Sequence, residues 1–361
     1  MRSAIHSNAS LRDLWQNVPN TREHDFCKQN QCSEAELAHA LVGFGNHQIR
    51  CQLDKFFPAL EQLGPVMALS RNGAAVHEKT GTYGGYKSGT HASVILGDGI
   101  DLRIFPKHWR HAYHVEKRRD QNTTLRSFQF FDAHGQAVHK IYERYETDRL
   151  GWDRLLEEMR IDASDEPLRV EELAQRSRVD DLKPVSVGDK SRLLRAWSTL
   201  QDTHQFQQMI RRSKLSRVQA IAAAEGEFST RLAPLAIDLL LNRLPADNLP
   251  IMVFVRNHGT LQIHSGPIQN VKRMGNWLNV LDEGFHMHLR DDLIDSAWIV
   301  RKPTKHSDVF SLELFDQYGE QVVLLNGDRR QGDNHSSVQD WNAIPSSLPT
   351  QIEAESLEAA Q

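Results

Sequence analysis

The sequence predicts an α+β protein with an internal duplication: two similar units, each made of helices followed by a large antiparallel β-sheet. Three observations carry this prediction. Helical periodicity gives way to strand-like alternation at Val66, turn signals then separate short apolar runs, and the same order of segments begins again near residue 190. One order of elements that occurs twice along a chain indicates a duplication.

The first half is predicted to be helical over residues 11–63, where Ser33-x-x-Glu36 has the pattern of a capping box. Sheet begins at Val66, and Asp98-Gly99 is a hairpin signal before a strand over 100–104. Since successive side chains of a strand point to opposite faces, Ile100, Leu102 and Ile104 share one face, and Asp101 and Arg103 share the other.

Further strands are predicted over 127–132 and 138–142, followed by a closing helix around Trp152. The acidic, proline-containing stretch that comes next is typical of a connection between domains. The predicted domain organisation is an N-terminal repeat over 1–160, a linker over 161–189, a C-terminal repeat over 190–345 and a polar tail over 346–361.

Residue matches support the duplication more strongly than the order of elements does. Tyr113-x-Val115-x-Lys117 returns as Trp298-x-Val300-x-Lys302, about 185 residues later. Further pairs are Arg71-Asn72 with Arg256-Asn257, Ser33-x-x-Glu36 with Ser216-x-x-Gln219, His77 with His264, and Trp152 with Trp341.

Composition excludes several classes of protein. The chain of 361 residues is 39% hydrophobic and 25% charged, which suits two globular domains. A net charge of −4 gives no general attraction to nucleic acid, and no stretch approaches membrane-spanning length. Met1 to Trp15 contain no apolar leader region, so a cytoplasmic location is expected. Three cysteines without metal-type spacing are expected to be reduced and structural.

The most informative stretch is a predicted helix over 193–206 that contains His204. Leu193, Trp197, Leu200 and His204 follow at intervals of four, three and four residues, which would place the imidazole in line with an apolar stripe. Such a histidine is either a core residue or a metal ligand aimed at whatever the stripe covers.

The duplication provides an internal comparison for these alternatives. Asn20-Thr21-Arg22 stands opposite Asp202-Thr203-His204, and Glu34 stands opposite Arg217. Packing in this unit therefore does not require histidine at that place, and the second half has both an imidazole and a cation where the first has neither. This difference favours a ligand role for His204, with cations nearby to hold the acidic edge of a flat, apolar molecule.

At these residues the chain resembles the haemin-degrading and haem-trafficking factors of Gram-negative bacteria, of the HemS, ChuS and PhuS type. The similarity runs from about Leu11 to Trp341, in the right order and with the right duplication. The segments that carry it are Ala196-Trp197 with Asp202-x-His204-x-Phe206, Asp101-Leu102-Arg103-Ile104-Phe105, Arg301-Lys302-Pro303-Thr304 and Ser311-Leu312-Glu313-Leu314-Phe315.

The resemblance implies two similar antiparallel sheets with helices between them and haem, iron protoporphyrin IX, in a cleft between the halves. His204 would be the proximal iron ligand, Arg103 would approach the opposite face, and Arg217, Lys302 and Arg329 would hold the propionates. Arg217 has independent support, because the Ser216/Gln219 capping box places it at a helix start that attracts carboxylates. One departure is Asn326-Gly327-Asp328-Arg329, where relatives carry Tyr-Gly-Gln-Arg.

Two functions remain open at this point. As an enzyme, the protein would open the haem ring oxidatively with electrons from outside, and His204 and Arg103 would be its catalytic residues. As a carrier, it would pass haem to a separate haem oxygenase. Either way, the expected partners are haem, an inner-membrane haem transporter upstream, and a reductase or haem oxygenase downstream, with no nucleic acid and no membrane insertion.

Other motifs are weaker. No G-x-G-x-x-G nucleotide site or H-E-x-x-H zinc site is present. The pair His286 and His288 could bind a metal, but a solvated sheet face is the better explanation. His77 is either a sheet-face residue or a second haem contact. A DNA-binding helix-turn-helix over 25–42 is disfavoured, since its second helix would carry two glutamates and no cation.

Overall fold

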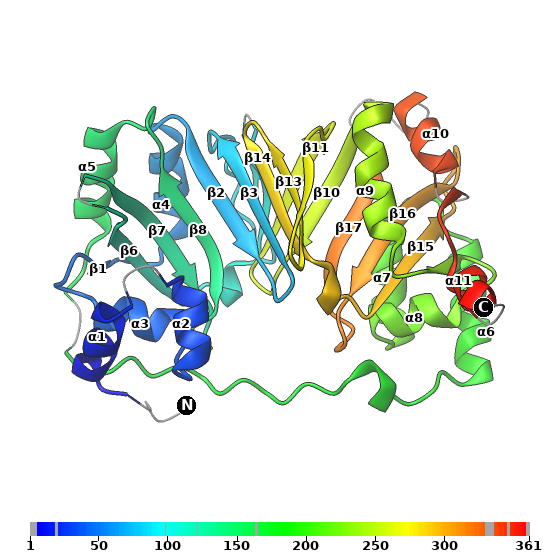
Figure 1. Cartoon of the computed structure of the whole chain (residues 1–361), viewed down its shortest axis with the longest axis horizontal. Helices are drawn as coiled ribbons and strands as arrows, with labels where there is room; N and C mark the ends of the chain where they lie inside the picture. The colour runs from blue at the N-terminus through cyan, green and yellow to red at the C-terminus, as the bar shows by residue number, and fades with distance from the viewer. Residues whose placement is uncertain are drawn as a thin grey trace. The chain divides into compact units, whose positions relative to one another are not determined.

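The computed structural model describes residues 6–18, 21–97, 99–120, 122–162, 165–328, 336–344 and 347–358. It is a mixed helix and strand protein with two large antiparallel sheets, as the sequence predicted (Figure 1). The chain divides into two compact units. Unit 1 comprises residues 1–71, 77–174 and 256–262, and unit 2 comprises residues 72–76, 175–255 and 263–361.

Two short segments, residues 72–76 and 256–262, belong to a different unit from their neighbours in the chain. Each begins with or contains an asparagine that stabilises its turn. Asn72 accepts hydrogen bonds from the backbone of Ala74 and Ala75, and its amide donates to the Val322 carbonyl, 2.8 Å away. Asn257 does the same in unit 1, where its amide donates to the carbonyls of Arg71 and Val138. An asparagine whose side chain binds its own turn stabilises that turn, so the matched Arg-Asn pairs mark equivalent turns.

The elements of unit 1 follow the predicted order of helices first and sheet second. Its helices are α1 (Asn8–Gln16), α2 (Glu23–Gln29), α3 (Glu34–Ala40), α4 (Leu53–Glu61) and α5 (Arg149–Met159). Its strands are β1 (His47–Gln48), β2 (Val66–Arg71), β3 (Ala75–Gly81), β4 (Ser93–Leu96), β5 (Asp101–Ile104), β6 (His111–Arg118), β7 (Thr124–Phe131) and β8 (Ala137–Glu143).

Unit 2 repeats this order with one more strand between β11 and β15 and with α11 added after α10. Its helices are α6 (Val187–Ser198), α7 (His204–Ser213), α8 (Arg217–Ala223), α9 (Ala236–Asp247), α10 (Ser336–Ala343) and α11 (Gln351–Glu358). Its strands are β9 (Ser229–Leu232), β10 (Ile251–Arg256), β11 (Thr260–Gly266), β12 (Val271–Met274), β13 (Trp277–Asp282), β14 (Phe285–Arg290), β15 (Ser296–Lys302), β16 (Val309–Phe315) and β17 (Gln321–Gly327).

Sheet topology confirms the duplication. The strand order β1-β6-β7-β8-β2-β3 in unit 1 corresponds to β9-β15-β16-β17-β10-β11 in unit 2. Even the irregularities match, because the register shifts between Phe130 and Phe131 in one unit and between Leu314 and Phe315 in the other. A bulge kept at one place in both copies indicates a common ancestral strand pair.

Each core lies where an apolar sheet face meets helices. In unit 1, Trp152 of α5 is fully buried and stacks on Phe128 of β7, with ring centroids 4.4 Å apart. In unit 2, Trp341 of α10 is equally buried and donates to the Phe310 carbonyl. The predicted alternation is also confirmed: Ile100, Leu102 and Ile104 are completely buried, while Asp101 and Arg103 are partly exposed. Asp98, part of the predicted turn signal, lies outside the described residues.

The predicted helix over 193–206 is wrong as one continuous element. Helix α6 ends at Ser198, and α7 begins at His204. The hydroxyls of Ser198 and Thr199 donate back to the carbonyls of Arg195 and Ala196, and such bonds compete with continuation of a helix. Consequently His204 does not continue the stripe of Leu193, Trp197 and Leu200.

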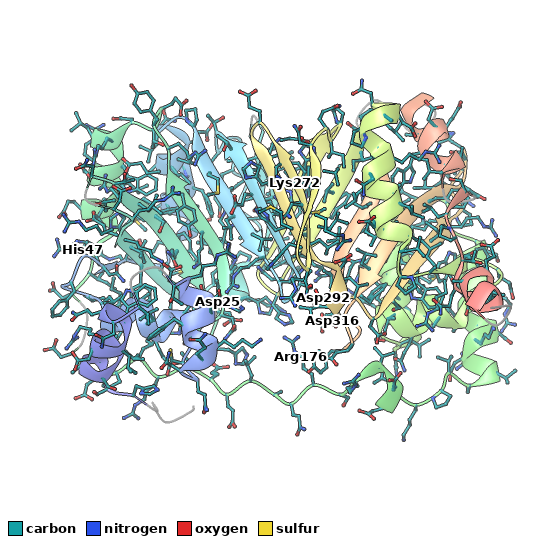
Figure 2. All side chains as sticks on the ribbon, viewed as in Figure 1. Asp25, His47, Arg176, Lys272, Asp292 and Asp316 are labelled. Carbon is teal, nitrogen blue, oxygen red and sulfur yellow. The ribbon has the colours of Figure 1, made fainter. Side chains whose placement is uncertain are left out.

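The predicted linker and tail have structure of their own. Arg176, in the linker, lies with its guanidinium 6.0 Å from the ring centroid of Tyr318 (Figure 2). In the tail, α11 follows Leu348, which packs in the core of unit 2. The sequence prediction placed Leu348 outside the C-terminal repeat, because a single leucine among polar residues gives no periodic signal.

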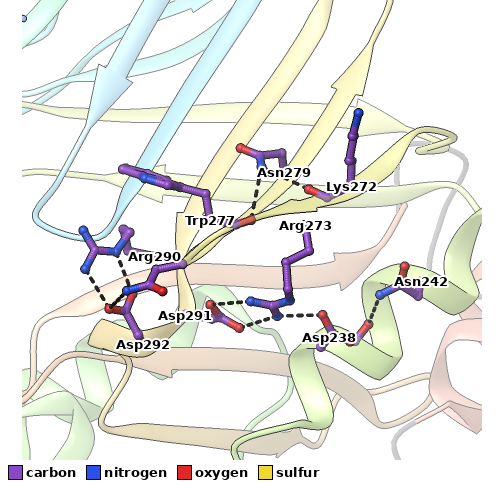
Figure 3. A network of polar contacts seen from close by, with 10 residues as sticks. Asp238, Asn242, Lys272, Arg273, Trp277, Asn279, Arg290, Asp291 and Asp292 are labelled. Carbon is purple, nitrogen blue, oxygen red and sulfur yellow. Dashed lines mark hydrogen bonds and ion pairs between the residues drawn. The ribbon is translucent and has the colours of Figure 1, made fainter.

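A network of ion pairs fixes the outer strands of unit 2 to α9. Arg273 of β12 donates to Asp238 of α9 at 2.7 Å and to Asp291 at 2.6 Å, and Arg290 pairs with Asp292 (Figure 3). Exposed ion pairs individually contribute little to the stability of a protein. A guanidinium shared by two carboxylates, however, restricts the segments that carry them. Within the described residues, no helix is long and apolar enough to cross a bilayer.

Candidate functional site

His204 is the first residue of α7, and its side chain is 94% exposed. Its Nδ1 lies 2.6 Å from Oδ1 of Asp202, and the same oxygen accepts the backbone N–H of His204 at 2.7 Å. A carboxylate in this position favours a proton on Nδ1, so the lone pair of Nε2 points outward. An imidazole oriented in this way is a candidate metal ligand.

Asp202 is a site residue that the sequence analysis did not identify. The need for a group to orient the second nitrogen is general for histidine ligands, and the spacing Asp-x-His was present in the quoted segment. What hid it was the assumption of a continuous helix, in which residues two apart do not face each other. The break between α6 and α7 brings them together.

A groove of about 600 Å³ lies between α6 and α7. Its lining includes the apolar side chains of Leu193, Leu200 and Met209. It also includes the cations Arg192, Arg212 and Lys214 and the carboxylate of Asp189, which pairs with Arg192. Leu193 and Leu200 of the predicted apolar stripe therefore line the groove, but Trp197 and His204 are not among its lining residues.

Arg217 and Lys302 meet at one buried carboxylate, Glu313. Arg217 begins α8 and donates to both oxygens of Glu313, at 2.6 and 2.8 Å. The ammonium of Lys302 donates to Glu313 at 2.9 Å and to the hydroxyl of Ser311 at 2.7 Å. The structure thus brings together two of the predicted propionate-binding cations, and the acid between them was missed by the sequence analysis.

Glu313 is completely buried, Lys302 is buried and Arg217 is partly buried. Burial alone would raise the pKa of Glu313, but the charges and hydrogen bonds of Arg217 and Lys302 outweigh it and hold the pKa far below the usual range. Both cations also lie over the ring of Phe206, 4.8 and 4.9 Å from its centroid. With one carboxylate and two cations, the cluster carries a net charge of +1.

Unit 1 contains the same cluster with reversed polarity. Glu34, at the start of α3, is buried and pairs with Lys140 at 2.7 Å and with Arg71. Helix α3 corresponds to α8, so an acid on the helix faces cations on the sheet in unit 1, whereas a cation on the helix faces an acid on the sheet in unit 2. Each cluster has one carboxylate and two cations, so Arg217 reflects an exchange of charge partners and not a gain of positive charge.

Arg103 belongs to unit 1, where β5 positions it on the partly exposed face of its hairpin. Its side chain is 34% exposed and forms an ion pair with Asp101, and it also donates to the Leu102 carbonyl at 3.2 Å. Arg329 lies outside the described residues. Its neighbour Asp328 is buried, and the Asp328 backbone N–H donates to the Pro250 carbonyl at 3.0 Å.

Three other histidines that the sequence singled out lie within the sheets. His77 is completely buried, and His264 stacks flat on Phe285 with centroids 3.7 Å apart. His288 bonds through Nδ1 to Asn279 at 2.7 Å. The helix-turn-helix hypothesis meets a steric objection, because α3 is buried along its whole length and cannot enter a DNA groove.

Comparison with known proteins identifies the family of the chain. The model of the haemin-degrading HemS.ChuX domain matches residues 31–159 and again residues 214–348. The chain belongs to the haemin-degrading HemS.ChuX family. The two matched segments lie one in each half, as the duplication requires.

The relatives of this HemS.ChuX protein are similar over nearly their whole length. It is 34% identical over 315 residues to the hemin transport protein HmuS of Yersinia pestis, covering 87% of this chain and 89% of that one. Holo-PhuS, a heme-binding protein from Pseudomonas aeruginosa, superimposes with a TM-score of 0.87 at 34% identity, over 96% of this chain and 100% of PhuS. ChuS, an E. coli heme oxygenase, does so with a TM-score of 0.82 at 30% identity, over 94% and 99%.

Proposed function

We propose that this protein is a cytoplasmic haem-binding protein of haem-iron uptake that degrades haem oxidatively and releases its iron. One observation carries the proposal: His204 presents an exposed imidazole whose Nδ1 is held by Asp202, in a chain similar over its whole length to a heme-binding protein and a heme oxygenase. His204 is the proximal ligand in this proposal, and haem is both ligand and substrate.

The proposed role of each site residue follows from the chemistry of its side chain. Haem supplies the iron that binds dioxygen and the ring that is oxidised. Asp202 keeps the His204 ring in one tautomer and makes Nε2 a stronger donor. Arg103 carries a guanidinium with donors and no acceptor, so it would supply a hydrogen bond on the side of the haem opposite His204. Electrons come from an external reductase.

The propionates are assigned to Arg217, Lys302 and Arg329. The cluster around Glu313 has one positive charge in excess, so a propionate would bring it to neutrality. Arg217 is the more accessible of the two described cations, since 18% of its side chain is exposed against 7% for Lys302. Arg217 is therefore the expected direct contact, and Lys302 supports it through Glu313.

A non-enzymatic carrier is the second candidate. It is favoured by the relative HmuS, which is named a hemin transport protein. A carrier needs His204 and the propionate cluster but no oxygen chemistry at Arg103. In both cases an inner-membrane haem transporter would supply haem. The carrier would deliver it to a separate haem oxygenase.

The two candidates are separated by giving the purified protein one equivalent of haemin, an electron donor and catalase. The enzyme is expected to lose its Soret band and release a linear tetrapyrrole and iron. An unchanged Soret band, with haem transferred intact to an added haem oxygenase, would establish the carrier. Catalase is required because free peroxide destroys haem without any enzyme.

Asp202→Asn is expected to weaken haemin binding by about tenfold, the usual effect of removing an outer-shell partner of a metal ligand. The amide keeps a hydrogen-bond acceptor near Nδ1 but lacks the charge that strengthens Nε2. The reduction potential of the bound iron should rise for the same reason. Titration by visible absorption and a spectroelectrochemical measurement test both effects, with the exposed Asp180→Asn as a matched charge control.

Arg103→Ala should leave haemin affinity within about threefold, because Arg103 is not the axial ligand in this proposal, but abolish turnover. The ferric spectrum should change, since the distal hydrogen bond is lost. Arg110→Ala, an exposed arginine of the same unit, provides the control. A spectrum and turnover equal to those of the unmodified protein would remove Arg103 from the site.

A further inference from the structure

Cys27 and Cys32 lie together in unit 1, at the end of α2 and just before α3. The backbone N–H of Cys32 donates to the Cys27 carbonyl at 3.1 Å, which closes the turn at the end of α2. Gln31, between them, has a φ of 53°, a left-handed turn that folds the chain back on itself. A left-handed turn closed by this hydrogen bond is one in which the side chains at the positions of Cys27 and Cys32 commonly meet.

The duplicate in unit 2 shows that packing does not require thiols here. Lys214 has a φ of 59° at the position of Gln31, and Ser216 caps α8 as Ser33 caps α3. Counted from these caps, Ile210 and Leu215 occupy the places of Cys27 and Cys32, and both pack in the apolar cluster of their unit. The first half thus carries two sulfurs where the second half carries hydrocarbon.

The two thiols are unequal. Cys27 is 4% exposed, whereas Cys32 is partly exposed. The hydrogen bond to Cys32 and burial both raise the pKa of Cys27, so Cys27 remains protonated. A protected thiol beside an accessible one is the arrangement in which the accessible sulfur reacts first and the protected sulfur resolves the product.

We propose that Cys27 and Cys32 form a redox modification site, at which a hydroperoxide converts the two thiols to an intramolecular disulfide. Hydrogen peroxide transfers one oxygen to the Cys32 sulfur, giving a sulfenic acid and water. The Cys27 sulfur then attacks the Cys32 sulfur, its proton leaves with the hydroxyl as a second water, and the S–S bond forms. Two thiols are oxidised by two electrons, and one peroxide is reduced to two waters.

The bond would join the end of α2 to the start of α3. Cys32 directly precedes the Ser33 cap, and Glu34, next in the chain, is the buried acid paired with Lys140. Oxidation therefore restrains the segment that positions the charge cluster of unit 1. This site is independent of the haem function, since none of its residues is assigned to haem.

The test uses the full-length, haem-free protein in metal-free buffer with hydrogen peroxide, stopped by catalase. Denatured protein is then alkylated with N-ethylmaleimide and its intact mass measured. Before oxidation all three cysteines should be alkylated, and afterwards only Cys51, with an underlying loss of about 2 Da. Trypsin cleaves at Lys28, so non-reducing digestion should yield two peptides joined through Cys27 and Cys32, which dithiothreitol separates.

Cys51 is an internal control, because burial raises its pKa to about 12 and slows its oxidation. Cys32 should be oxidised at least about tenfold faster than Cys51. In Cys27→Ser, dimedone should trap a sulfenic acid on Cys32. The double variant Cys27→Ile, Cys32→Leu copies the residues of unit 2 and should fold without losing mass on oxidation. Full alkylation of wild-type Cys27 and Cys32 after peroxide, or oxidation of Cys51 at an equal rate, would overturn the proposal.

Discussion

Replacing His204 by alanine is expected to lower the affinity for haemin by about 100-fold or more and to shift the Soret maximum, because the iron loses its axial nitrogen. The imidazole is 94% exposed and makes its side-chain hydrogen bond only to its neighbour Asp202 among the described residues. Its removal should therefore leave the fold intact. Titration with haemin by visible absorption, together with circular dichroism, measures both effects.

His91→Ala is the matched control, since His91 is also exposed and lies in unit 1. It should bind haemin as the unmodified protein does. Equal affinities for the His204 and His91 variants would show that another residue binds the iron, and the proximal assignment would then be withdrawn.

Replacing Glu313 by glutamine is expected to destabilise the protein by about 3–5 kcal/mol, because two buried cations lose their shared counter-ion. Arg217 and Lys302 would face each other at Glu313 without a negative charge between them. Urea denaturation at neutral pH measures the loss. Glu225→Gln, an exposed acid of the same unit, should change stability by less than about 0.5 kcal/mol.

The effect should depend on pH in a defined direction. The cations lower the pKa of Glu313 in the folded state, so the folded protein holds this carboxylate ionised below the unfolded value of 4.5. The stability it contributes is fully present above that value and is lost as the pH falls through the folded pKa. The difference between wild type and Glu313→Gln should therefore narrow in acid. A difference that stays constant from pH 7 to pH 3 would mean that packing, rather than charge, is responsible.

Periodicity and repetition predicted much of the fold. The order of helices and strands, the alternation at Ile100 to Ile104, both capping boxes and the pairing of Trp152 with Trp341 were all readable, because each rests on local chemistry. The break between α6 and α7, just before His204, could not be predicted. It depends on side-chain hydrogen bonds of Ser198, Thr199 and Asp202 that compete with a plausible helical pattern.

Only some residues of the candidate site could be predicted from the sequence, for a similar reason. Residues that stand out against the duplicate, such as His204 and Arg217, were found by comparison of the halves. Glu313 was quoted only as part of a strand motif, since a lone acid between Leu312 and Leu314 does not reveal its partners. Those partners, Arg217 and Lys302, come from α8 and β15, and only the fold shows that they converge.

The opposite polarity of the two buried clusters makes the copies non-interchangeable. If α8 docked on the sheet of unit 1, Arg217 would meet the two cations Lys140 and Arg71. If α3 docked on the sheet of unit 2, Glu34 would meet Glu313, and Lys302 would be the single cation left to pair with both. Like charges buried together cost several kcal/mol. A chain with two similar units can pair a helix of one unit with the sheet of the other while it folds. The opposite placement of the buried charges disfavours that wrong pairing.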